Sequence, residues 1–133
     1  MMDRYKLIEL AVNAKEKSYS PYSKFRVGAA LISKDGKVFD GANIENAAYS
    51  VTMCAERTAA FAAKLDGVDK YEAIAVASDS NDYIPPCGSC RQVLLELCGE
   101  NLDVHITNGK AEVKSFKLKD LLPFSFGDKN LNG

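Results

Sequence analysis

The sequence predicts an α/β protein of three layers, α/β/α, in which helices cover both faces of one mixed five-stranded sheet. Three observations support this fold class. Helical and strand-like segments alternate along the 133 residues, an Asp-Gly pair marks a hairpin between the first two strands, and one near-continuous apolar run is typical of a strand covered on both faces. The length suits one hydrophobic core, so we expect residues 1–133 to form a single domain.

The N-terminal half predicts a helix followed by a strand hairpin. Residues 3–18 carry apolar side chains on one helical face, and Pro21 ends this helix because a proline disfavours helix in the residue before it. Residues 25–32 alternate in the way a strand does. After the Asp-Gly turn, residues 37–44 are expected to return antiparallel to them.

The C-terminal half continues the alternation. Residues 54–65 are apolar nearly all round, so we expect a helix that is covered on both sides, and residues 71–78 predict the central strand. A helix from Pro86 ends at Gly99. Two strands and a short helix follow, at residues 103–107, 111–116 and 117–123. The pattern leaves open whether the last two strands form a hairpin or lie as parallel neighbours.

Composition and charge exclude several classes of partner. The net charge is -1 and the pI about 5.8, with no cluster of lysine and arginine, so nucleic acid is not an expected partner. The N-terminal segment is charged and lacks the apolar region of a signal peptide, and the longest apolar stretch, VGAALI, is too short to cross a bilayer. We therefore expect a cytoplasmic protein without membrane contact. Its four cysteines are then thiols or metal ligands rather than disulfides.

Three of the cysteines lie at the starts of two predicted helices. Cys54 begins one helix, and Cys87 and Cys90, in PPCGSC, begin another. The N-terminus of a helix stabilises a thiolate, because its unpaired N–H groups and dipole are positive. Three thiolates at two adjacent helix ends form three corners of a tetrahedron, which suits Zn²⁺ and leaves the fourth position for water. Glu56 lies beside this position, where a carboxylate can take a proton from the water and pass it on.

The same residues allow other interpretations. A C-x-x-C motif also occurs in redox proteins, but here no tryptophan precedes it, and a redox pair leaves Cys54 and Glu56 unexplained. Cys98 shares a helical face with leucines and is expected to be a small buried apolar residue. His105, the one histidine, alternates with apolar residues on a strand, and we give it no catalytic role.

Five motifs resemble, in the same order, those of the small homotetrameric zinc-dependent cytidine deaminases: PYSKFRVGAAL, GANIENAAYS, CAERTAAF, PCGSCRQVLLEL and LLPFSF. The resemblance extends from Ser20 to Phe126. It implies the cytidine-deaminase-like fold, one Zn²⁺ per chain, and a homotetramer with shared active sites. The implied reaction is the hydrolytic deamination of cytidine and deoxycytidine to uridine and deoxyuridine with release of ammonia, a step of pyrimidine salvage.

The resemblance also implies a role for each matching position. Cys54, Cys87 and Cys90 match the zinc ligands. Glu56 matches the proton shuttle, which protonates ring N3 while the zinc-bound hydroxide attacks C4. Asn43 and Glu45 match the pair that binds the ribose 3′-hydroxyl, and Phe25 matches the aromatic residue of the pocket. The Ala55 N–H is implied to bind the pyrimidine O2, and the Pro85 carbonyl the departing amine. Three positions match residues that complete a neighbouring subunit's site: Ala47, Tyr49 and Phe126.

Two further positions concern the charge of the metal site. Three thiolates and Zn²⁺ leave one net negative charge, which makes the bound water less acidic than neutral histidines would. Arg57 and Gln92 resemble the family's donors to the thiolates. The LLPFSF motif departs from the family, which more often has a small residue after the proline. Phe124 therefore competes with Phe126 for the aromatic role.

Two rival functions remain from the sequence. A deaminase of another aminopyrimidine nucleoside, such as blasticidin S, shares the zinc core but lacks the FxVGAA and NIEN elements. A non-catalytic, zinc-stabilised binding module would have no use for Glu56 and an open coordination position. A polynucleotide deaminase is disfavoured by the length and the charge of the chain.

Overall fold

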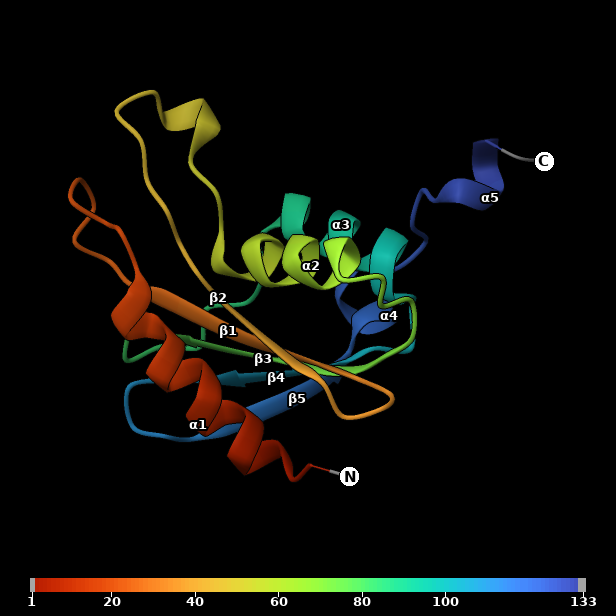
Figure 1. Cartoon of the computed structure of the whole chain (residues 1–133), viewed down its shortest axis with the longest axis horizontal. Helices are drawn as coiled ribbons and strands as arrows, with labels where there is room; N and C mark the ends of the chain where they lie inside the picture. Colours follow the sequence, from red (N-terminus) through yellow and green to blue (C-terminus); the bar gives the residue numbers. More distant parts are fainter. Residues whose placement is uncertain (1, 132–133) are drawn as a thin grey trace.

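The computed structural model describes residues 2–131 and has the predicted order of α-helices and strands as far as residue 121 (Figure 1). The five strands are β1 (Val27–Ser33), β2 (Val38–Ala42), β3 (Tyr71–Ser78), β4 (Asp103–Thr107) and β5 (Val113–Lys117). The α-helices are α1 (Arg4–Ala14), α2 (Ala55–Leu65), α3 (Gly88–Cys98), α4 (Leu118–Leu121) and α5 (Asp128–Leu131), and the short 3-10 helices are η1 (Lys15–Lys17) and η2 (Tyr49–Val51).

The strands form one mixed sheet in the order β2-β1-β3-β4-β5. β3 and β4 are parallel, and the other neighbouring pairs are antiparallel. The last two strands form a hairpin in which Val104 lies opposite Phe116, which settles the alternative that the sequence left open. The mixed five-stranded sheet predicted from the sequence is confirmed.

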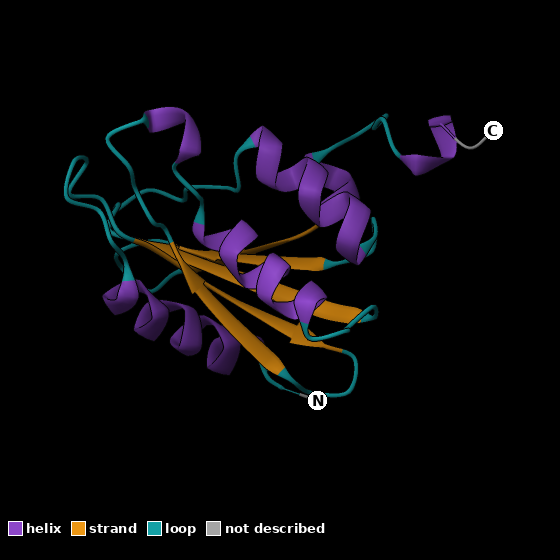
Figure 2. Cartoon of the chain, turned by 45° about the horizontal axis from the view of Figure 1, so that its top comes forward, coloured by secondary structure: helices purple, strands orange, loops and turns teal. Residues whose placement is uncertain are grey.

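Helices cover both faces of the sheet. α1 lies on one face, while α2 and α3 lie side by side on the other (Figures 1 and 2). Each face has its own apolar cluster, with Leu7 and Ile8 of α1 in one, and Leu31, Ile74 and Leu94 in the other. β3 lies in the middle of the sheet and is buried along its length apart from the half-buried Glu72, as the near-continuous apolar run predicted. Within residues 2–131, no helix has both the length and the apolar character needed to cross a membrane.

Three expectations about helices need correction. α1 ends at Ala14, and the 3-10 helix η1 takes up most of the residues predicted to continue it. The structure also contains α5, which the sequence pattern did not indicate. The prediction that α2 is covered on both sides is wrong for a single chain, because Phe61 and Leu65 are 39% and 90% exposed on it. The alanines of α2 lie mostly on its buried side, where Ala59 and Ala63 are fully covered, so one side of the helix faces the molecule and the side with Phe61 and Leu65 does not.

Gly41 sets the distance between β2 and the first turn of α2. A Cβ atom at this position would lie 2.4 Å from the Ala55 carbonyl oxygen and 2.4 Å from Thr58 Oγ1. The Thr58 hydroxyl also lies against β2, 3.1 Å from the carbonyl oxygen of Ala42. The missing side chain therefore lets the helix turn that contains Glu56 lie directly on the strand.

We expect Gly41→Ala to destabilise the protein by about 1–3 kcal/mol, because the added methyl group overpacks a backbone contact. Urea unfolding measures the free energy. Gly127→Ala is the matched control, since the nearest atom to an added Cβ there is 3.9 Å away. Equal free energies of unfolding for Gly41→Ala and the wild type would contradict the close contact.

Candidate active site

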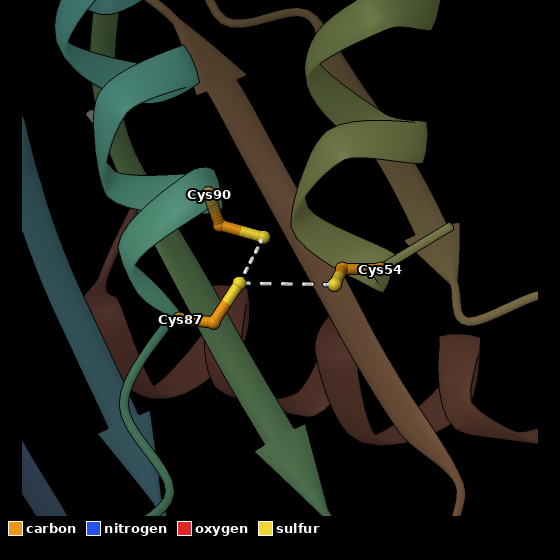
Figure 3. A group of neighbouring side chains, drawn as sticks. All are labelled: Cys54, Cys87 and Cys90. Carbon is orange, nitrogen blue, oxygen red and sulfur yellow. Dashed lines mark hydrogen bonds between the residues drawn. The ribbon is translucent and has the colours of Figure 1, made fainter. Parts of the chain in front are cut away.

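Two helix N-termini meet at the cysteines. Cys54 is the N-cap of α2 and Cys87 the N-cap of α3, and neither side chain makes the hydrogen bond of an ordinary cap. Cys90 lies in the first turn of α3. Figure 3 shows the three sulfur atoms turned toward one another between the two helices. The thiols are therefore free to bind something other than their own helix ends.

The spacing of the sulfur atoms fits a tetrahedral metal. Cys54 Sγ and Cys87 Sγ are 4.0 Å apart, Cys87 Sγ and Cys90 Sγ are 3.4 Å apart, and all three lie within 4.8 Å of one another. Zinc–sulfur bonds of about 2.3 Å at tetrahedral angles place sulfurs about 3.8 Å apart. Cys98 lies outside this group, and burial raises the pKa of its thiol to about 12.

Arg57 supplies positive charge to this cluster. Its Nη2 donates a hydrogen bond to Cys54 Sγ at 3.3 Å. A hydrogen bond with Cys90, and then the hydrogen bond and charge of Arg57, lower the pKa of the Cys54 thiol to about 5. The Nε of Arg57 is buried and finds no hydrogen-bond partner among the described residues. A partly buried guanidinium beside sulfur atoms fits a site whose sulfurs are anionic.

The three thiols cannot all ionise at low cost without a cation. The hydrogen bond that favours the Cys54 thiolate raises the pKa of the Cys90 thiol, and burial adds to this effect. Two thiolates at this distance repel each other in a partly buried site. A divalent cation at the centre removes the repulsion, so the donor set suits Zn²⁺.

Glu56 is a buried acid next to this cluster. It lies in the first turn of α2, is 5% exposed, and directly follows Ala55 and the ligand Cys54. Burial raises the pKa of its carboxyl to about 7, and the neighbouring Cys54 thiolate contributes to the shift. A group with a pKa near neutrality can both accept and donate a proton at physiological pH.

A polar segment runs directly beside Cys54. Ile44 and Met53 pair as an antiparallel bridge, with N–H···O distances of 2.9 Å in both directions. Asn43 and Glu45 flank Ile44, and in an extended chain side chains two positions apart point to the same side. The bridge therefore holds the backbone of this segment beside Met53, the residue that precedes Cys54.

Protein contacts occupy most of the Asn43 side chain. Its Oδ1 accepts hydrogen bonds from the Val27 N–H at 3.0 Å and from the Ser18 hydroxyl, and its Nδ2 donates to the Phe25 carbonyl at 2.8 Å. Asn43 is 9% exposed. These contacts tie the segment to the start of β1.

Glu45 is engaged by a loop. Its Oε1 accepts from the N–H groups of Tyr22 and Ser23, each at 3.1 Å, and its Oε2 accepts from the Ser23 hydroxyl. The hydrogen bonds from Ser23 lower the pKa of Glu45, so its carboxyl is ionised at neutral pH. Glu45 lines a surface pocket together with Tyr22, Ser23, Tyr49 and Thr52.

Comparison with known proteins identifies the family. A profile of the cytidine and deoxycytidylate deaminase zinc-binding region matches residues 1–105. The chain is 47% identical over 131 residues to a cytidine deaminase of Sporosarcina psychrophila. The match covers 98% of this chain and 96% of that protein. It is 48% identical over 131 residues to a cytidine deaminase of Halalkalibacterium halodurans, and this match covers 98% of this chain and 99% of that protein. The chain belongs to the cytidine deaminase family.

A solved structure of the same family shares the fold. The crystal structure of a cytidine deaminase from Burkholderia pseudomallei is 49% identical and matches with a TM-score of 0.91, covering 94% of this chain and 100% of that chain. The cytidine-deaminase-like α/β fold and the zinc-binding cysteine cluster expected from the sequence are thereby confirmed.

The structure gathers some predicted site residues and separates others. The three cysteines and Arg57 meet at the helix ends, with the buried Glu56 between Cys54 and Arg57 in the chain. Ala55 is buried in the same helix turn, Pro85 is exposed just before α3, and the half-buried Phe25 contacts Asn43 through its carbonyl. The residues predicted to reach a neighbouring subunit's site are exposed on the single chain, and that role stays a prediction: Ala47, Tyr49 and Phe126.

The C-terminal segment is held by α3. Gln92 Nε2 donates to the Phe126 carbonyl at 2.8 Å, so this structure directs the amide toward the C-terminal segment, and its predicted bond to a thiolate stays a prediction. The segment between α4 and α5 leads away from the body of the molecule (Figure 1). Phe124 and Phe126 are both exposed, and Phe124 has a positive φ of 51°.

Sequence reasoning missed three residues around the site. Arg91 donates from Nε to the Pro86 carbonyl and from Nη1 to the Leu121 carbonyl, each at 2.7 Å. Ser18 and Ser23 bind the side chains of Asn43 and Glu45. Serines in a turn near a proline look like an ordinary loop, and no local pattern signals these long-range contacts.

We expect Cys87→Ala to lose its zinc and Cys98→Ala to retain it, because Cys87 belongs to the sulfur cluster and Cys98 does not. Metal analysis of the purified proteins is the measurement, with about one zinc per chain expected for the wild type and the Cys98 variant. Fully active enzyme with almost no zinc, or loss of zinc from Cys98→Ala, would contradict the assignment.

Proposed function

We propose that residues 1–133 act as one deaminase domain that hydrolyses cytidine and deoxycytidine to uridine and deoxyuridine and releases ammonia, a reaction of pyrimidine salvage. The observation that carries this proposal is the three-sulfur cluster with Glu56 beside it, a buried acid of pKa about 7. We also propose that the protein works in the cytoplasm, where the thiols of its metal site stay reduced.

The chemistry needs an activated water and a proton carrier. Cys54, Cys87 and Cys90 would hold Zn²⁺, which when bound would supply the Lewis acidity that lowers the pKa of a water molecule. Glu56 would take the protons of the attacking water and deliver one to ring N3 and one to the amine. The water oxygen bonds to C4, the bond from C4 to the exocyclic nitrogen breaks, and the two water protons end on N3 and on ammonia.

The polar segment offers the hydrogen bonds that one hydroxyl group needs. Among the described residues, the contacts of Asn43 leave one N–H of Nδ2 unused, and those of Glu45 leave one acceptor position of Oε2 unused. A hydroxyl accepts one hydrogen bond and donates one. This match supports the assignment of Asn43 and Glu45 to the ribose 3′-hydroxyl, with Phe25 as the adjacent aromatic wall.

Backbone groups at the helix starts complete the proposed site. Ala55 is the first residue of α2, and the first N–H groups of a helix have no partner within it, which supports a hydrogen bond from Ala55 to the pyrimidine O2. We assign the Pro85 carbonyl to the departing amine. Arg57 and Gln92 are the proposed donors that reduce the negative charge on the thiolates.

We also propose a homotetramer in which Ala47, Tyr49 and Phe126 complete a neighbouring subunit's site. The support is the exposed apolar surface of the single chain, which includes Tyr49 at 75% and Phe126 at 61% exposure. Leu65 on the outer side of α2 is likewise 90% exposed. In a tetramer, contacts with other subunits would cover such side chains.

Glu56→Gln should keep its zinc and lose at least 10²–10⁴-fold in turnover, because the amide preserves the shape but cannot carry the proton. Loss of the ultraviolet absorbance of cytidine measures turnover, and metal analysis measures zinc. Glu96→Gln is the matched control, since Glu96 is an exposed helix residue. Addition of a strong zinc chelator to the wild type should abolish turnover as well. Turnover of Glu56→Gln within tenfold of the wild type would show that another group carries the proton.

Shared sites predict complementation between inactive variants. Glu56→Ala and Phe126→Ala should each be nearly inactive alone. After unfolding and refolding of equal amounts together, random assembly combines an intact Glu56 with an intact Phe126 in about a quarter of the sites. Activity should therefore return to about a quarter of the wild-type value.

Two results would contradict the shared site. One is a light-scattering mass of a single chain in an active preparation. The other is mixed tetramers that form but recover no activity, provided that Phe126→Ala alone is badly impaired.

A further inference from the structure

Ser23 links two residues that the proposed function places around the sugar. Its hydroxyl donates to Glu45 Oε2 and accepts from the Phe25 N–H at 3.0 Å. Its own N–H donates to Glu45 Oε1 at 3.1 Å. One side chain in an exposed loop thus contacts both the carboxylate and the backbone of the neighbouring aromatic residue.

These contacts are part of a closed chain of hydrogen bonds. The N–H of Phe25 is held by Ser23, and its carbonyl is held by Asn43 Nδ2 at 2.8 Å. Asn43 and Glu45 are two residues apart on one extended segment, and Glu45 binds Ser23 in turn. The hydrogen bonds that lead from Glu45 to Ser23, Phe25 and Asn43 therefore begin and end on the same extended segment.

The loop conformation depends on the same hydroxyl. Lys24 lies between Ser23 and Phe25 and has a φ of 58°, in the left-handed region that residues other than glycine rarely adopt. The hydrogen bond from the Phe25 N–H to Ser23 Oγ spans this residue. Without the hydroxyl, the Phe25 N–H loses its partner and the turn loses the bond that closes it.

The orientation of Glu45 depends on Ser23 even more directly. Oε1 accepts from two backbone N–H groups, while the Ser23 hydroxyl is the donor to Oε2. An ionised carboxylate has about two acceptor positions per oxygen. Ser23 occupies one position on Oε2 and leaves the other in a fixed direction. Without the hydroxyl, water reaches both acceptor positions of Oε2, and the position that would meet the sugar no longer has a fixed direction.

We propose that Ser23 is a positioning residue that orients Glu45 toward the sugar 3′-hydroxyl, and that it thereby sets the preference of the enzyme for nucleosides with this group. The inference rests on the proposed function, which assigns Asn43 and Glu45 to the 3′-hydroxyl. Ser23 acts through Glu45 and Phe25, so its effect follows the sugar of the substrate and not the chemistry at C4.

The test compares Ser23→Ala with the wild type on cytidine and on 3′-deoxycytidine. Loss of an oriented hydrogen bond, made equally to bound substrate and transition state, raises KM and leaves kcat unchanged. We expect the KM for cytidine to rise about tenfold with kcat within about threefold of the wild type, and the kinetics with 3′-deoxycytidine to change less than about threefold. The ratio of kcat/KM for cytidine to kcat/KM for 3′-deoxycytidine should therefore fall by about tenfold.

Matched variants isolate the hydroxyl. Ser23→Thr keeps a hydroxyl and should retain the preference, while Ser23→Cys has a similar size with a weak donor and should lose it as Ser23→Ala does. Ser20→Ala is the control in the same loop, since the Ser20 hydroxyl contacts Ser18 and not Glu45. Thermal unfolding of each variant verifies that the fold is kept.

The outcomes separate this inference from the proposed function. Equal losses on both substrates in Ser23→Ala, or no loss on either, would overturn the role of Ser23. Glu45→Gln tests the sugar assignment itself. If Glu45→Gln leaves the preference intact, the assignment fails together with the inference. If Glu45→Gln removes the preference and Ser23→Ala does not, only the inference about Ser23 fails.

Discussion

The meeting of two helix N-termini is the constraint on which the site depends. Cys54 and Cys87 cap α2 and α3 without using their side chains as caps, so both sulfurs and the positive ends of both helices face the same point. The parallel pairing of β3 and β4 makes this possible, because α3 connects these strands and lies beside α2 on one face of the sheet. A change in the packing of either helix moves a metal ligand.

The same helix packing gives Glu56 its chemical character. Gly41 allows the first turn of α2 to lie on β2, and in that position Glu56 is 5% exposed. Burial raises the pKa of the carboxyl to about 7, whereas an exposed glutamate would stay ionised at neutral pH and would be a poor acid. Burial of a carboxyl costs stability, and the close contact at Gly41 is part of what holds it there.

Local patterns in the sequence predicted most of the fold and the centre of the site. Residues 71–78 form a strand with the predicted limits, and the cysteines and Glu56 lie at the starts of helices as their positions indicated. The direction of the last strand pair could not be predicted, because pairing is a contact between segments and not a property of either. The exposed side of α2 was misjudged because Phe61 and Leu65 are apolar and yet lie at the surface of the single chain, which the apolar pattern of the helix does not reveal. Ser23 was missed because its partner Glu45 is 22 positions away.

The residues proposed for a neighbouring subunit's site, among them Tyr49, lie exposed on the single chain. The ring of Tyr49 meets the ring of Tyr22 edge to face, with centroids 6.3 Å apart, and Tyr22 donates its N–H to Glu45. If Tyr49 contributes to a neighbouring site as proposed, the loop that orients Glu45 lies against a residue involved in assembly. Sugar binding and subunit contact then share one small group of side chains. Assembly would limit the movement of Tyr22, and with it the movement of the carboxylate that the sugar meets.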